Sequence, residues 1–100
     1  MATKAKKIDI SKLEEGLEQL TGFDFKAAEK TARSNGENIP EIALSKSFQA
    51  LLAAKALGVG VLAIEDMPIA DFAKATTKVF NFLYKDLGKN PPADSTESQE

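Results

Sequence analysis

The apolar residues between Ile69 and Leu87 recur at helical spacing, and this pattern limits the fold more than any other feature of the chain. On a helical wheel they fall within an arc of roughly 100–120°, which predicts one long amphipathic helix. Pro68 suits its first turn, where the missing N–H breaks no hydrogen bond. The residues of the arc are Ile69, Phe72, Ala73, Thr76, Val79, Phe80, Leu83 and Leu87.

Phe82 lies well outside that arc, beside Ala75 and Val79 on the wheel. Two interpretations of this position stay open. Either another element of the same domain covers the ring, or an exposed apolar patch meets a partner. We therefore take Phe82, Ala75 and Val79 as candidate partner-binding residues.

Two shorter helical patterns lie near the N-terminus. Ser11 and Glu14 have the spacing of a capping box, in which hydroxyl and carboxylate each satisfy a free backbone N–H. Asp24 is a natural cap for a second helix, which is expected to stop at Asn35 and Gly36. The first helix has a narrow apolar seam of Leu13, Leu17 and Leu20.

The next pattern predicts a central helix that begins near Asn38, carries Pro40 in its first turn and ends at Gly58. Its many alanines widen the apolar surface, as expected for a helix at the centre of a bundle. The run Val61–Ile64 that follows is too short to distinguish a strand from a helical turn. Four residues of the central helix are expected to face water: Ser45, Lys46, Gln49 and Lys55.

One hundred residues have room for a single domain. The patterns predict an all-α fold, a small bundle of about four helices, over residues 11–87. Residues 1–10 are expected to be a flexible basic arm, and residues 88–100, rich in proline and polar side chains, a disordered acidic tail. No segment approaches the ~20 unbroken apolar residues that span a bilayer.

The residue types that are missing exclude several kinds of chemistry. The chain has no cysteine and no histidine, which excludes disulfides, Cys/His zinc sites and imidazole-based triads. Glu14, Glu15 and Glu18 are better explained by the favourable helix dipole than by a metal site. With Arg33 as the only arginine and a net charge of −2, nucleic-acid binding is not expected. We predict no enzymatic activity, no cofactor and no metal.

A series of short motifs resembles a family of bacteriophage tail assembly chaperones. The resemblance covers about residues 12–85 and includes Leu20–Asp24, Ala28–Arg33, Ala53–Gly58 and the spacing of Phe72, Thr76, Val79, Phe82 and Leu83. Known members often carry a β-rich segment before the Leu-Thr-Gly turn, where this chain has a capped helix. The positions that match the family motif most directly are Gly22, Asp24, Glu29 and Arg33.

The resemblance implies a late protein of the host cytoplasm that takes part in virion assembly and is absent from the mature virion. It would bind the tape-measure protein, and a longer form made by ribosomal frameshifting would bind the major tail protein. A different reading is a small helical regulator, either a helix-turn-helix repressor or a toxin-neutralising partner. Whether the chain associates with itself stays open.

Overall fold

The computed structural model describes residues 8–89, and every regular element in that range is helical. The predicted all-α fold is therefore confirmed. The expected basic arm and acidic tail lie outside the described residues, except for residues 8–10 and 88–89. In chain order the elements are the 3₁₀ helix η2 (Ile10–Lys12), α1 (Leu13–Glu18), α2 (Gly22–Ser34), the 3₁₀ helix η3 (Ile42–Leu44), α3 (Lys46–Leu57), α4 (Val61–Glu65) and α5 (Ile69–Lys89).

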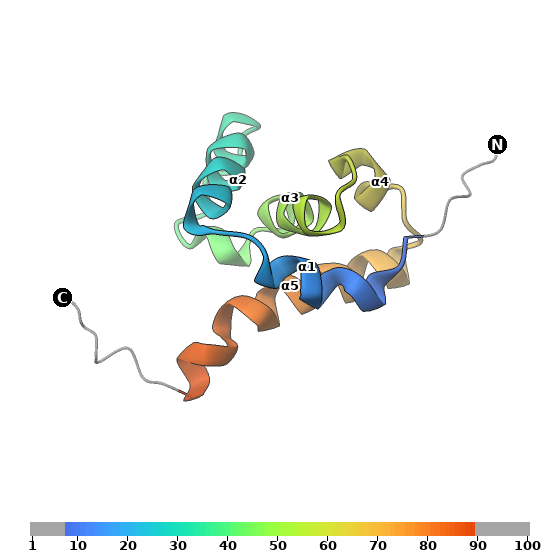
Figure 1. Cartoon of the computed structure of the whole chain (residues 1–100). Coiled ribbons are helices and arrows are strands. Elements are labelled where there is room, and N and C mark those ends of the chain that lie inside the picture. The colour runs from blue at the N-terminus through green and yellow to red at the C-terminus, as the bar shows by residue number, and fades with distance from the viewer. Residues whose placement is uncertain (1–7, 90–100) are drawn as a thin grey trace.

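Helix α3 occupies the centre of the bundle, as its alanine-rich sequence predicts. It packs against α1, α2, α4 and α5. Figure 1 shows α2 on one side of α3, α4 on the other side, and α1 with α5 beneath it. The buried residues of α3 are Phe48, Gln49, Ala50, Leu52, Ala53 and Ala54.

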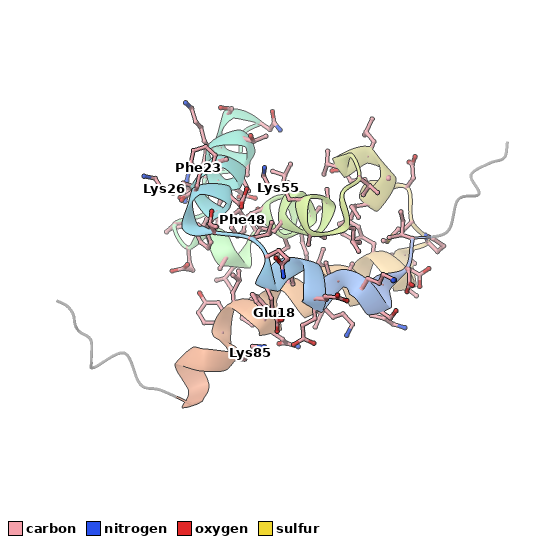
Figure 2. All side chains as sticks on the ribbon, viewed as in Figure 1. Glu18, Phe23, Lys26, Phe48, Lys55 and Lys85 are labelled. Carbon is pink, nitrogen blue, oxygen red and sulfur yellow. The ribbon has the colours of Figure 1, made fainter. Side chains whose placement is uncertain are left out.

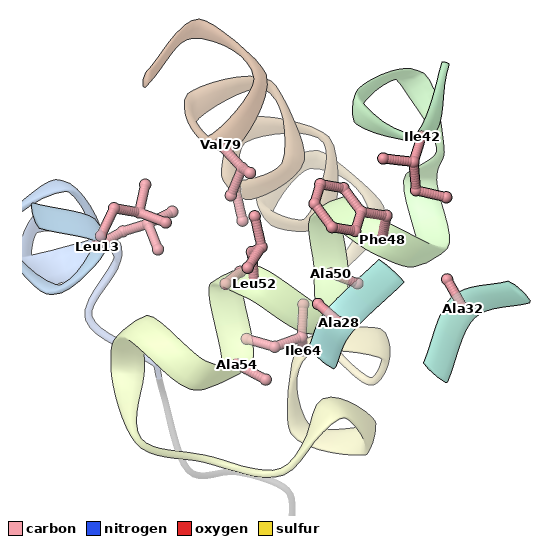
Figure 3. Packing of buried hydrophobic residues seen from close by; sticks show 13 residues of the cluster. Leu13, Ala28, Ala32, Ile42, Phe48, Ala50, Leu52, Ala54, Ile64 and Val79 are labelled. Carbon is pink, nitrogen blue, oxygen red and sulfur yellow. The ribbon is translucent and has the colours of Figure 1, made fainter. Parts of the chain in front are cut away.

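The core forms where side chains of the outer helices converge on α3. Phe48 has no exposed surface, and its ring meets Phe25 of α2 edge to face, with 4.8 Å between ring centroids. Figure 3 shows Leu13 and Val79 approaching Leu52 from α1 and α5. Because each outer helix contributes only a few large apolar residues, none of them is expected to be stable without α3.

Helices α1 and α3 cross closely at Gly16. A Cβ added to this glycine would overlap the carbonyl oxygen of Ala56 and would lie 2.7 Å from its carbonyl carbon. No side chain fits between the two backbones at this point. Nothing in the sequence pattern around Gly16 indicates this close crossing.

The first helical segment begins differently from the prediction. Asp9 is the cap, because its Oδ1 accepts a hydrogen bond of 3.1 Å from the Ser11 backbone N–H. Residues 10–12 form one 3₁₀ turn before α1 begins at Leu13. The capping box predicted for Ser11 and Glu14 is therefore wrong.

Helix α3 begins later than predicted. Ser45 is its cap, with its Oγ accepting a 3.1 Å hydrogen bond from the Phe48 N–H. The segment that includes Pro40 forms a loop and η3, where Gln49 Nε2 donates to the Ala43 carbonyl at 2.7 Å. These bonds explain why Ser45 and Gln49, predicted to face water, are each only 3% exposed. The predicted end at Gly58 is confirmed by its left-handed backbone, with φ of 71°.

The remaining two helices complete the chain. The undecided run after Gly60 is helical and forms α4. Helix α5 continues through Gly88 to Lys89, slightly beyond the predicted end. Its C-terminal turns extend past the rest of the bundle (Figure 1). Within residues 8–89, none of the helices combines the length and the apolar character that a bilayer crossing requires.

Candidate functional site

The buried face of α5 is rotated from the predicted apolar arc. Ala75, Thr76 and Val79 have no exposed surface, whereas Ile69 is 86% exposed. Ala75 and Val79 therefore cannot contribute to an exposed partner-binding patch, because the bundle covers them. A helical wheel cannot indicate which part of the apolar arc is buried, because the apolar residues occupy a wider arc of α5 than the bundle covers.

Phe82 is half-buried and packs against the core cluster. The ammonium group of Lys85 lies 4.7 Å from its ring centroid, and the same group is 3.2 Å from the Glu14 carboxylate of α1. Figure 2 shows Lys85 on the stretch of α5 that runs below α1. Of the two readings of Phe82, the structure supports cover by other elements of the domain.

Three residues on the other edge of the predicted arc remain at the surface of α5, and Tyr84 lies just beyond that edge. Ile69 and Ala73 are exposed, and Phe80 and Tyr84 are half-buried. Their spacing places them within about 60° of one another around the helix. The Phe80 and Tyr84 rings are in contact, with centroids 4.9 Å apart. We call Ile69, Ala73, Phe80 and Tyr84 the outer stripe of α5.

The C-terminal end of the outer stripe lies near the segment around η3. The 3₁₀ helix η3 contacts α5, and its residue Leu44 is 50% exposed. Partial burial raises the pKa of the Tyr84 phenol above its ordinary value, and the adjacent Glu41 carboxylate raises it further. Tyr84 therefore stays neutral at physiological pH, and its ring presents an uncharged surface.

Two lysines lie beside the outer stripe. The Nζ of Lys46, from α3, donates a hydrogen bond of 3.3 Å to Thr76 Oγ1 at the inner edge of the stripe. Lys74 follows Ala73 on α5 and is exposed. Neither lysine forms an ion pair with another residue in the range 8–89. Lys46 thus places a positive charge at one edge of the apolar surface, and Lys74 adds a second further around the helix on the other side.

Two of the family-motif residues, Gly22 and Asp24, occupy the first turn of α2. Gly22 opens the helix, and Asp24 Oδ2 accepts a 2.9 Å hydrogen bond from the Thr21 backbone N–H. This bond, more than the Lys55 ammonium 3.7 Å away, lowers the pKa of Asp24. The prediction that Asp24 is the cap itself is wrong, because the capping residue is Thr21 and Asp24 is its partner in a capping box.

Arg33 holds the loop that follows α2. Its Nε is 3.0 Å from Glu29, which confirms the predicted pair. Its guanidinium also donates to the carbonyl oxygens of Ile39, at 2.9 Å, and Pro40, at 3.3 Å. Four motif positions, Gly22, Asp24, Glu29 and Arg33, therefore shape α2 and its exit, and none of them belongs to the outer stripe of α5.

Glu37, in the same loop, makes the folding stability depend on pH. Hydrogen bonds from the Ser45 hydroxyl and from the Ile39 N–H lower the pKa of Glu37 below its ordinary 4.5. A lowered folded-state pKa adds stability above the unfolded-state value, and this stability is lost as the pH falls through the folded-state value. We expect the thermal midpoint to stay nearly constant from pH 7 to about pH 5 and to fall below about pH 4.5.

Glu37→Gln tests this dependence because it removes one contributing carboxylate. We expect a smaller loss of thermal midpoint between pH 5 and pH 3 than in the parent chain, measured by circular dichroism in matched buffers. Glu65→Gln is the control, since Glu65 is exposed and forms no ion pair within residues 8–89. Equal acid profiles for Glu37→Gln and the parent chain would contradict the role of Glu37.

Other surface features are less organised. Phe23 of α2 is 80% exposed and Leu62 of α4 is 69% exposed; Figure 2 shows Lys26, near Phe23, pointing away from α3. A hollow of about 520 Å³ lies between η2, α1 and the end of α3, and Gly16 and Ala56 contribute to its wall. Over residues 8–89 no three acidic side chains gather in a way that could hold a metal ion.

Comparison of the chain with protein-family models, with curated proteins and with solved structures finds no match. The functional assignment therefore depends on the surface of the chain and on its short motifs. Of the surfaces described, the outer stripe is the one that places several exposed or half-buried apolar side chains along one helix.

Proposed function

We propose that the chain binds an apolar helix of another protein along the outer stripe of α5. The observation that carries this proposal is the exposure of Ile69, at 86%, on a helix whose neighbouring face, formed by Ala75, Thr76 and Val79, is fully buried. From Ile69 to Tyr84 the stripe extends about 22 Å, which matches four turns of a docked helix. Laying one helix along another is a common way to cover such a face.

Within that class, we propose a phage tail assembly chaperone. Its partner would be the tape-measure protein, whose long helix exposes apolar residues before the tail tube encloses it, and a frameshifted longer form would bind the major tail protein. The order and spacing of the motifs from Leu20 to Leu83 support this proposal. A host-cytoplasmic protein that is absent from the mature virion belongs to the same proposal.

The structure gives less support to a helix-turn-helix regulator. A recognition helix must place exposed basic side chains in the major groove of DNA. Helix α3 is surrounded by the other helices. Of its two lysines, Lys46 reaches Thr76, and Lys55 reaches Asp24.

Co-expression with a candidate tape-measure protein tests the proposed function. We expect the tagged chain to retain the tape-measure protein on an affinity column, and the double variant Ile69→Asp with Ala73→Asp to lose at least about nine-tenths of it. Both residues are exposed, so the variant should fold with an unchanged circular dichroism spectrum.

Phe23→Asp is the matched control, because Phe23 is exposed to a similar extent, at 80%, but lies on α2. It should retain the partner. Failure of the parent chain to retain any tape-measure protein, together with a DNA shift at physiological salt, would favour the regulatory alternative. Equal losses in both variants would contradict a role specific to the outer stripe.

A further inference from the structure

The charges beside the outer stripe specify its partner further. Lys46 reaches over Thr76 from α3, while Lys74 lies on α5, about 100° around the helix from Ala73. We propose that the partner is an amphipathic helix with carboxylate side chains along both edges of its apolar face, one edge facing Lys46 and the other facing Lys74. This inference rests on the proposed function, because it concerns the same surface.

The position of Lys46 supports recognition of a charge at the stripe. Thr76 has no exposed surface, and its hydroxyl also bonds the Phe72 carbonyl at 3.1 Å. Lys46 is thus held at the edge of the apolar surface without an acidic partner within residues 8–89. A docking helix would remove water from the apolar surface and bring its own edge beside this ammonium group, which strengthens attraction between opposite charges.

The same charges argue against a second copy of this chain as the occupant. An antiparallel pair of α5 helices would bring Lys46 and Lys74 of one copy against the same two lysines of the other. Four ammonium groups would then surround one small apolar contact, and like charges so placed oppose association. At the other end of the stripe Glu41 lies beside Tyr84, so the partner's carboxylates belong over the Ala73 half.

Two synthetic helical peptides of about 18 residues, enough to cover the stripe, test the inference. Both carry leucines at helical spacing; one has glutamates along the two edges of the leucine face and the other has lysines there. We expect the full chain to bind the glutamate peptide about tenfold more tightly in fluorescence anisotropy. Lys46 and Lys74 would each attract the glutamates of one peptide and repel the lysines of the other, and each of these four effects is modest. Raising the salt concentration should reduce that preference.

The double variant Lys46→Glu with Lys74→Glu should reverse the preference, and Lys46→Gln with Lys74→Gln should abolish it while keeping a hydrogen-bonding group near Thr76. The double variant Lys26→Glu with Lys30→Glu is the control, because both lysines are exposed on α2 and it carries the same change of charge as Lys46→Glu with Lys74→Glu. It should leave the preference unchanged.

The outcomes separate this inference from the proposed function. Equal binding of both peptides, or a preference that survives both double variants, would overturn the inference and leave helix binding intact. Binding of neither peptide would overturn both. A dimer in sedimentation that Ile69→Asp with Ala73→Asp converts to monomer would assign the stripe to a second copy and would likewise overturn the inference.

Discussion

Replacing Phe48 by alanine is expected to lower the free energy of unfolding by about 3–5 kcal/mol. The ring has no exposed surface and packs edge to face on Phe25, so its removal leaves a cavity at the centre of the bundle. Domains of this size have about 5–15 kcal/mol of stability in total. Thermal and urea unfolding would therefore show a markedly lower midpoint, or a partly unfolded chain at 37 °C.

Phe23→Ala is the matched control for that substitution. Phe23 is 80% exposed, and a surface substitution of this kind changes stability by less than about 0.5 kcal/mol. Similar losses for the two variants would contradict the placement of Phe48 at the centre of the core.

The second large effect is expected for Gly16→Ala. Alanine favours a helix by about 1 kcal/mol over glycine, but its Cβ would overlap the Ala56 carbonyl oxygen. The obstacle is backbone, which cannot rotate away, so α1 must move away from α3. We expect a net loss of at least about 2 kcal/mol, or a fall in thermal midpoint of roughly 8–16 °C.

Gly22→Ala provides the comparison within the same chain. Gly22 is also helical, but a Cβ there would meet nothing within 4 Å. That variant should be as stable as the parent chain or gain up to about 1 kcal/mol. A gain in stability for Gly16→Ala would contradict the close crossing of α1 and α3.

The Phe48→Ala and Gly16→Ala variants also allow the effects on folding to be separated from the effects on partner binding. Phe48 and Gly16 lie in the packing between helices, whereas Ile69 and Ala73 lie on the outer surface of α5. If the proposed function is correct, surface variants change partner binding at constant stability, and core variants change both together. The division follows from the geometry of α5, which has one covered and one uncovered apolar edge.

The family-motif residues have an explanation that does not require a partner. Asp24 bonds the Thr21 backbone N–H at the start of α2, and Arg33 holds the carbonyl oxygens of Ile39 and Pro40 after its end. These contacts define where α2 begins and how the chain turns toward α3. In the proposed chaperone, the motif would preserve the shape of the bundle while α5 meets the partner.

The sequence by itself determined the helical fold, the central place of α3 and the pair between Glu29 and Arg33. Those features depend on local spacing: apolar periodicity, alanine content, and a contact across one helical turn. It also predicted the left-handed stop at Gly58, because glycine readily adopts that backbone conformation.

Only the tertiary structure decided which edge of the apolar arc of α5 is covered. Ala75 and Val79 are buried and Ile69 is exposed because α1 and α3 approach α5 from one side, and a wheel contains no information about neighbours. The same holds for Gly16, whose role depends on the Ala56 carbonyl 40 residues further along the chain. Contacts between distant segments, and the surfaces they leave open, arise when the whole chain packs.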